Sequence, residues 1–353
     1  MTGHGTVVFV WRRIPPPFLI GGAEVSQQLL AEQFTAAGWT TIYLASHEPP
    51  WSQASELSSM VRHLNGAGIA VDVLEKQQKF HYTWNGVDIR VVPQVHLLAE
   101  LRRVLREVNP DLVVTSQEGS AELAATARPF TTVAGWLHSV SKTGFHVLDG
   151  KPQIALATSR FVCSRVPRSQ AAVLFYPPFA PAAQAGPAVT GDLLMVNPVP
   201  AKGSALVRRL VEIMPERRFT LVEGWWDTSA EFAQLRNVTW VPRTYDMASL
   251  YTGHQILLVP STVEDAFPRV VVEAGLHGLP SLGSTRGGIP EAIGNADLLA
   301  APDDLEAWVA LIRNLTGCAL TVAAQRAREV AIPMTRPCIS ELIAMGVIAG
   351  QPA

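Results

Sequence analysis

The chain has 353 residues, of which 48% are hydrophobic and 16% charged, and its formal net charge is −2. This composition excludes a disordered chain, and the near-neutral charge gives no general field that attracts nucleic acid or an anionic membrane. No apolar run reaches the roughly 18 residues of a membrane-spanning helix, and the first residues lack the charged and apolar parts of a secretion signal. We therefore expect a cytoplasmic protein without a nucleic-acid partner or an integral membrane segment.

The first half of the chain alternates strand patterns with helix patterns. The length also exceeds what one hydrophobic core usually fills, which predicts two α/β domains. A helix is predicted to open at Gly21 and Gly22, and another covers 97–108. Buried-strand patterns occupy 6–11, 40–44, 87–92, 112–115, 131–137 and 155–157. Strands that alternate with helices predict a parallel sheet.

The second half repeats this alternation after a segment of different composition. Residues 179–191 (FAPAAQAGPAVTG) are rich in Ala, Pro and Gly and carry no charge, which is typical of a connection between domains. Predicted strands follow at 192–196, 218–222, 238–241, 255–259 and 280–283, with helices at 204–213, at 269–275 and from residue 305 onward. We expect an N-terminal domain at 1–180, a linker at 181–191, a C-terminal domain at 192–330 and a helical tail at 331–353.

Two acidic residues stand out in the segment 260–294, which follows one of the predicted strands. Ligands of open α/β sheets bind beyond the carboxyl ends of the strands. Asp265 lies in the loop, and Glu273, after seven intervening residues, lies inside a predicted helix. Two carboxylates so placed can accept hydrogen bonds from different hydroxyls of one polyol, and the loop amides and the helix dipole between them favour a phosphate or sugar oxygen. The segment therefore predicts a site for a sugar or a phosphate.

The segment 260–294 resembles the signature of the retaining glycosyltransferases of family 4, which have the GT-B fold. The matching residues are Gly-Leu-Pro at 278–280 and Gly-Gly-Ile-Pro-Glu at 287–291. The resemblance implies an α/β protein with two facing Rossmann-like domains and a deep cleft between them, and we expect the tail at 331–353 to cross back to the N-terminal domain. It also implies transfer of a sugar from a nucleotide-diphosphate-sugar with retention of the anomeric configuration.

The same resemblance implies roles for the two acids. Asp265 would lie by the donor sugar, together with Ala266 and Phe267, and Glu273 would lie by the nucleotide ribose. The chain has Asp265 where the family usually has Glu, and Pro268 where the family usually has Gly. Because Asp is one methylene shorter than Glu, its reach to a sugar hydroxyl differs.

A second match lies at 196–203 (VNPVPAKG), which is similar to the loop after the first strand of the family's C-terminal domain. A basic pair usually holds the donor diphosphate there, and Lys202 corresponds to its lysine. An ammonium group at this place offsets the charge that grows on the leaving diphosphate. Asn197 stands where the family usually has Arg, so the second cation would come from Arg243, Arg269 or Arg286.

Residues of the N-terminal half complete the set. Gly21 and Gly22 match small residues of the family's first loop, which let backbone amides approach the donor phosphate and the acceptor. His138 ends a predicted strand and matches a family histidine beside the donor sugar, where an imidazole supports the developing positive charge. Glu118 follows the strand at 112–115 and is expected to face the acceptor. We assign the chemistry to His138, Asp265 and Lys202, and acceptor binding to Glu118 and His138.

The resemblance also defines the expected partners. No protein nucleophile is generally assigned in this family, and the chain has no Asp-x-Asp element for a nucleotide-bound metal, so we expect neither a metal nor another cofactor. The donor would be a UDP- or GDP-sugar. The acceptor would be a small soluble metabolite, because the compact chain has no lipid-anchoring segment.

Other functions of α/β folds fit less well. No GxGxxG follows a predicted strand, which argues against an oxidoreductase, and no GxxxxGK[ST] indicates an NTPase. Two alternatives stay open because a fold does not define chemistry. One is a GT-B nucleotide-sugar epimerase or phosphorylase, and the other is a catalytically degenerate binding protein, which Asn197, Asp265 and Pro268 motivate. Glu291 also has two interpretations, a helix cap or a donor contact.

Overall fold

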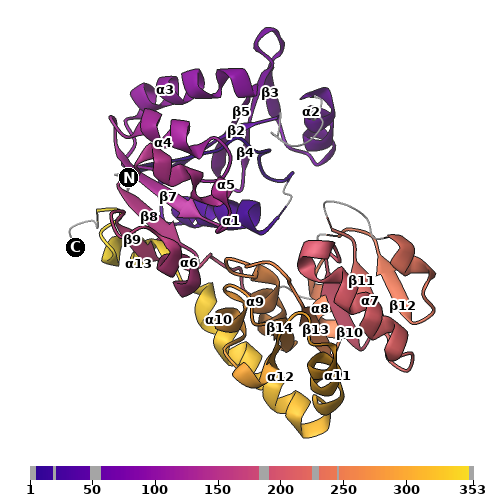
Figure 1. Cartoon of the computed structure of the whole chain (residues 1–353). Coiled ribbons are helices and arrows are strands. Elements are labelled where there is room, and N and C mark those ends of the chain that lie inside the picture. The colour runs from indigo at the N-terminus through magenta and orange to yellow at the C-terminus, as the bar shows by residue number, and fades with distance from the viewer. Residues whose placement is uncertain are drawn as a thin grey trace. The chain divides into compact units, whose positions relative to one another are not determined.

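The computed structural model describes residues 5–18, 21–47, 57–182, 191–224, 230–244 and 246–349. The chain divides into two compact units (Figure 1). Unit 1 contains Met1–Thr158, Val162–Pro178 and Pro337–Ala353, and unit 2 contains Ser159–Phe161 and Phe179–Arg336. The main division falls at Pro178, just before the expected linker, of which 183–190 lie outside the described residues.

Unit 1 is built on a nine-stranded sheet with the order β3-β4-β5-β2-β1-β6-β7-β8-β9. The parallel strands are β1 (Thr6–Val10), β2 (Thr40–Ser46), β5 (Val87–Val92), β6 (Leu112–Thr115), β7 (Thr132–Leu137), β8 (Ile154–Ala157) and β9 (Ala172–Leu174). β3 (Val71–Leu74) and β4 (Lys79–Trp84) add an antiparallel hairpin to β5. The predicted parallel sheet is confirmed, whereas the hairpin and β9 are additions that the sequence patterns do not predict.

The core of unit 1 has two layers, because successive side chains of each strand point to opposite faces of the sheet. Val7, Phe9 and Trp11 face one side of the sheet and pack with α1 (Gly22–Ala36), α2 (Leu57–Gly66) and α13 (Cys338–Ala344). Val8 and Val10 are equally buried and point to the opposite face, where α3 (Leu97–Val108) and α4 (Ser120–Ala127) contact the strands. Because helices cover both faces, the sequences of the strands are continuous apolar runs.

The last helix of the chain belongs to unit 1. The Cys338 amide donates to the side-chain oxygen of Gln33 on α1 at 2.9 Å, and Cys338 and Leu342 have no exposed surface. Residues 337–349 therefore complete the hydrophobic layer that β1 and α1 begin.

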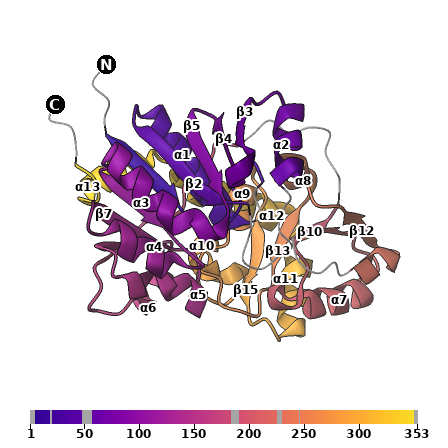
Figure 2. The ribbon, with the colours of Figure 1, turned by 90° about the horizontal axis from the view of Figure 1, so that it is seen from above.

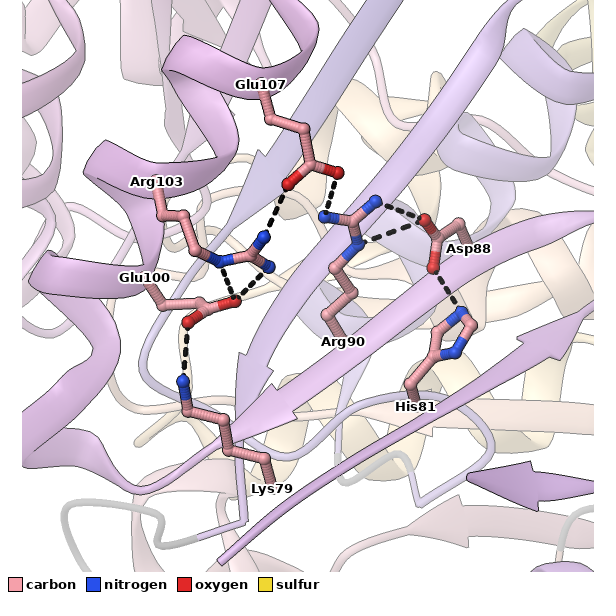
Figure 3. A network of polar contacts seen from close by, with 7 residues as sticks. All are labelled: Lys79, His81, Asp88, Arg90, Glu100, Arg103 and Glu107. Atoms are coloured by element: carbon pink, nitrogen blue, oxygen red, sulfur yellow. Dashed lines mark hydrogen bonds and ion pairs between the residues drawn. The ribbon is translucent and has the colours of Figure 1, made fainter. Parts of the chain in front are cut away.

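Charged side chains link β4 and β5 to α3 (Figure 3). Lys79 of β4 donates to Glu100 of α3 at 2.7 Å, Arg103 binds the same carboxylate, and Arg90 of β5 binds Glu107 at 3.1 Å. Glu100 is only 6% exposed. Burial alone would raise the pKa of Glu100, but the hydrogen bonds and charges of Arg103 and Lys79 outweigh burial and lower the pKa. The network thus keeps a buried carboxylate ionised.

Unit 2 is built on a six-stranded parallel sheet with the order β12-β11-β10-β13-β14-β15. Its strands are β10 (Leu193–Val196), β11 (Phe219–Val222), β12 (Val238–Val241), β13 (Ile256–Val259), β14 (Ser281–Ser284) and β15 (Leu299–Ala300). The first five lie within one residue of the predicted ranges, and β15 is an addition. The helices that follow the strands include α7 (Ser204–Ile213), α8 (Ala248–Gly253), α9 (Arg269–Leu276) and α10 (Ile289–Ile293).

Two further helices, α11 (Leu305–Asn314) and α12 (Gly317–Ala331), end unit 2. α11 contacts α7, and α12 lies beside α9, as Figure 2 shows. Within the described ranges, no single helix has the length and apolarity needed to cross a membrane. Among the described residues, α11 and the helical stretch Gly317–Thr335 reach that length and apolarity only when they are taken together, and this pair is bent by 99°.

Each sheet has a point where the strand order reverses. In unit 1, β1 lies between β2 and β6, and in unit 2, β10 lies between β11 and β13. Open parallel sheets bind ligands beyond the carboxyl ends of the strands at this point. Each unit therefore has its own edge at which functional side chains are expected.

Candidate functional site

The reversal point of the second sheet carries an ion pair formed by two loops. β10 leads into the short 3-10 helix Pro200–Lys202, and β13 leads into the loop that holds Asp265. Lys202 Nζ donates to Asp265 Oδ1, and Ser261 Oγ donates to Asp265 Oδ2 at 2.6 Å. Because β10 and β13 are the strands between which the order reverses, the pair lies where ligands of such sheets bind.

Glycines let the loops around this pair approach each other closely. Gly203 has a φ of +90°, and a Cβ there would lie 2.2 Å from the carbonyl oxygen of Pro260. Gly287 has a φ of +58°, and a Cβ there would lie 2.3 Å from the Asp265 carbonyl oxygen, which also accepts from the Gly288 amide at 2.7 Å. The turn at 287–288 therefore fixes the backbone of Asp265, which explains why the motif needs glycine.

Glu273 lies on α9 beside a buried cation. Arg269 Nε donates to Glu273 Oε1, and the Tyr251 hydroxyl donates to Glu273 Oε2, both at 3.1 Å. Arg269 is 8% exposed, and its guanidinium carbon lies 4.2 Å from the centre of the Phe179 ring. Burial lowers the pKa of Arg269 although Glu273 opposes this, and burial together with the Glu273 charge raises the pKa of Tyr251. Arg269 is thus paired with Glu273, and Arg243 and Arg286 are the other two candidates for the second cation.

Asn197 ends β10 with a left-handed backbone, at a φ of +59°. Its amide donates to the carbonyl of Val222 at 2.9 Å, and its Oδ1 is buried with no hydrogen-bond partner among the described residues. A buried amide oxygen requires a donor, and an N–H or O–H group of a ligand would supply one. Arg243 follows β12 and is exposed, and its amide donates to Glu223 at 3.2 Å.

Ala266 and Phe267 have buried side chains. Ser159 Oγ donates to the carbonyl of Ala266 at 2.6 Å, so a ligand contact at these two residues would come from the backbone. Glu291 accepts two hydrogen bonds from the Arg160 amide, at 3.0 and 2.9 Å. This geometry favours the helix-cap interpretation of Glu291, because Arg160 is the first residue of α6 (Arg160–Arg165).

Unit 1 holds an ion pair at its own reversal point. Arg13 follows β1 and donates to both oxygens of Glu118, which follows β6, at 2.8 Å each. Arg13 also donates to Glu24 of α1 at 2.5 Å, and Glu24 is 1% exposed. Burial alone would lower the pKa of Arg13, but the hydrogen bonds and charges of Glu118 and Glu24 outweigh burial and raise the pKa. The sequence patterns do not single out Arg13, although its place directly after a strand would have been a signal.

The other predicted residues of unit 1 also lie near strand ends. Gly21 directly precedes α1, and Gly22 is the exposed first residue of that helix. His138 follows β7, and its ring centre lies 4.4 Å from that of Trp136. Glu118, the residue expected to bind the acceptor, is held by Arg13.

Part of unit 2 matches a known protein family, and the whole chain is similar to several solved structures. The family model described as glycosyl transferases group 1 matches residues 205–317, and no curated protein matches the chain. HepE of Anabaena in complex with UDP and glucose is similar in structure, with a TM-score of 0.72, 16% identity and coverage of 98% of this chain and 99% of HepE. Sucrose-phosphate synthase from Thermosynechococcus elongatus has a TM-score of 0.69, 15% identity and 97% coverage of both chains.

A third solved structure is the catalytic domain of starch synthase IV from Arabidopsis thaliana bound to ADP and acarbose. It has a TM-score of 0.67 and 11% identity, with coverage of 98% of this chain and 100% of that domain. At these identities the likeness shows the fold, which is the GT-B fold with Rossmann-like sheets that the sequence predicts. The family match covers the part of unit 2 that contains Asp265 and Glu273.

Proposed function

We propose that the protein is a glycosyltransferase that binds a nucleotide-diphosphate-sugar in unit 2 and transfers the sugar to an acceptor. The observation that carries the proposal is the Lys202–Asp265 pair at the reversal point of the second sheet, because a cation there suits a diphosphate. The match of 205–317 to group 1 glycosyl transferases supports the proposal, as does HepE, which has this fold and binds UDP and glucose.

Lys202 would bind the donor diphosphate. Lys202 lies two residues before α7, so the positive end of that helix would add to its attraction for an anion. When the glycosidic bond breaks, negative charge grows on the leaving phosphate, and a fixed ammonium group stabilises this charge more than that of the bound donor. Asn197 follows β10 and Arg243 follows β12, and they would complete the phosphate and nucleotide contacts.

Glu273 would accept the ribose hydroxyls. Each of its oxygens accepts one hydrogen bond from the protein, and each carboxylate oxygen has a further lone pair. Arg269 and Tyr251 therefore orient the carboxylate without saturating it, which is the support that a binding group needs.

Unit 1 would receive the acceptor, through Glu118 and His138, with Gly21 and Gly22 at the first loop. We propose retention of the anomeric configuration, in which the leaving phosphate oxygen takes the acceptor's proton, so that the protein contributes positioning and charge stabilisation. A small soluble acceptor, a cytoplasmic location and a UDP- or GDP-sugar donor belong to the same proposal. We also propose that no metal takes part, so 5 mM EDTA should leave transfer unchanged, and a loss that Mg²⁺ or Mn²⁺ restores would contradict this.

A thermal-shift panel of UDP, GDP, ADP and dTDP tests the proposal. A ligand at 100 times its Kd stabilises the folded state by about 2.7 kcal/mol, which corresponds to a rise in Tm of roughly 5–10 °C for a unit of this size. We expect one nucleotide to produce such a rise in the wild-type protein and not in Glu273→Gln. If none of the four changes the Tm, the proposal is wrong.

A product assay with the corresponding nucleotide-sugar separates the alternatives. Sugar joined to an acceptor, or released to water in its absence, supports a transferase. Epimerised donor without transfer would indicate an epimerase, and binding without any turnover would indicate a degenerate binding protein.

A further inference from the structure

We infer that Asp265 acts through Lys202 and does not bind the donor sugar. Before the donor binds, Asp265 positions the ammonium group of Lys202, and when the donor arrives, Asp265 competes with the diphosphate for that group. This inference rests on the proposed function and deepens it, because it gives Asp265 a different task from the one that the family resemblance implies.

Each oxygen of the Asp265 carboxylate accepts one hydrogen bond within unit 2, and these bonds orient the carboxylate toward Lys202 and Ser261. Oδ1 accepts from Lys202 Nζ, and Oδ2 accepts from Ser261 Oγ at 2.6 Å. Ser261 is 1% exposed, and its carbonyl accepts from Ser284 Oγ at 2.7 Å. The backbone of Ser261, which carries the hydroxyl that binds Asp265, is therefore tied to the end of the neighbouring strand β14.

The backbone of Asp265 is equally fixed. Its carbonyl oxygen accepts from the Gly288 amide at 2.7 Å, and the turn at Gly287 lies so close that a Cβ there would be 2.3 Å from the same oxygen. The backbone of Asp265 is therefore tied to the turn at 287–288. Asp also has one methylene less than the Glu usual at this position, so its side chain cannot compensate by reach.

The exposed fractions of the two side chains also favour contact of the diphosphate with Lys202. The Lys202 side chain is 35% exposed and the Asp265 side chain 15%, so the ammonium group is the more accessible member of the pair. An approaching diphosphate meets Lys202 first and has to share its three N–H donors with Asp265. The negative charge of Asp265 also repels the diphosphate, so the carboxylate weakens the binding of donor and of released nucleotide alike.

Binding measurements with three probes test this inference. Isothermal titration with UDP, UDP-glucose and inorganic pyrophosphate is carried out on the wild-type protein, Asp265→Asn and Ser261→Ala. We expect Asp265→Asn to bind all three about tenfold more tightly, equivalent to about 1.4 kcal/mol, with the ratio of the UDP and UDP-glucose affinities unchanged. Ser261→Ala, which only loosens the carboxylate, should shift all three in the same direction by a smaller factor. Asp303→Asn removes an exposed charge from the same unit and should change binding less than twofold.

Kinetics add a readout that a merely structural role would not produce. In Asp265→Asn the KM for the donor should fall with its Kd. The kcat should also fall, because Lys202 is no longer held in place and the nucleotide leaves more slowly. Thermal unfolding of each variant checks folding. If Asp265→Asn is unstable, the binding measurements on Ser261→Ala still test the inference.

Three outcomes would overturn the inference. If Asp265→Asn weakens UDP-glucose but leaves UDP and pyrophosphate unchanged, Asp265 binds the sugar, and only this inference fails. If all three probes bind equally or more weakly, the competition for Lys202 is absent, and again the proposed function stands. If the wild-type protein binds none of the probes, the UDP-sugar donor of the proposed function is wrong and this inference fails with it.

Discussion

Replacing Arg13 by Met removes the cation at the centre of the unit 1 ion cluster. Arg13 donates to Glu118 at 2.8 Å through two nitrogens and to Glu24 at 2.5 Å. The Glu118 side chain is 25% exposed and can be hydrated again, whereas Glu24 is 1% exposed. The substitution therefore leaves Glu24 as a buried carboxylate without a counter-charge, the situation that destabilises most.

The magnitude follows from the removal of one partner of a buried ion pair, which costs about 3–5 kcal/mol because the remaining charge stays buried without compensation. We take the lower end of this range, because Glu118 can be hydrated again and only Glu24 keeps a buried charge. We expect Arg13→Met to lose about 3 kcal/mol of unfolding free energy at pH 7.

Urea unfolding at pH 7 measures this loss, as the shift in midpoint at constant m-value. The double variant Arg13→Met/Glu24→Gln should recover most of the stability, because it removes the buried charge. Arg128→Met takes away an exposed arginine of the same unit and should stay within about 0.5 kcal/mol of wild type. A loss below about 1 kcal/mol for Arg13→Met, or a double variant no more stable than Arg13→Met, would refute the reasoning.

Two further predictions concern pH and stability. The pKa of Glu100 is lowered in the folded state by Arg103 and Lys79 against the effect of burial (Figure 3). Its contribution is therefore present above about pH 4.3 and disappears as the pH falls through the folded pKa, so Glu100→Gln should cost about 1–3 kcal/mol at pH 7 and almost nothing near pH 2 in urea unfolding. Burial lowers the pKa of His254, whose ring nitrogens lie 2.6 Å from the carbonyl oxygen of Leu250 and 2.7 Å from Thr220 Oγ1. Its contribution is complete above about pH 6.5 and is lost as the pH falls below that value, so the Tm of His254→Gln should fall less than that of wild type between pH 7 and pH 5, and parallel Tm curves would contradict this.

The parallel part of both sheets was predictable because strands covered on both faces have unbroken apolar runs. The hairpin β3–β4 lies outside that pattern. In β4, buried Phe80 and Tyr82 alternate with the exposed residues His81 and Thr83, so no continuous apolar run marks the strand. β4 pairs antiparallel with β5 and contacts α3 through Lys79 and Glu100, and neither the pairing nor the contact follows from a local sequence pattern.

The candidate site was predictable to a similar degree. Lys202 and Asp265 each occur in a recognisable loop, and the strand order brings the two loops together. The Arg13–Glu118 pair spans 105 residues, and no local pattern indicates which carboxylate an arginine after a strand will meet. The contacts that orient functional groups, such as Ser261 with Asp265 and Tyr251 with Glu273, likewise follow from the packing of neighbouring strands and helices.

The affinity of Lys202→Met for UDP tests the central claim most directly. A hydrogen bond to a charged group contributes about 1.5–3 kcal/mol, so isothermal titration should show binding roughly 10- to 150-fold weaker than in wild type. Arg208→Met is the control, because Arg208 is an exposed arginine of α7 that pairs with Glu212, and its UDP affinity should equal that of wild type. Unchanged binding in Lys202→Met would contradict a donor site at the reversal point of the second sheet.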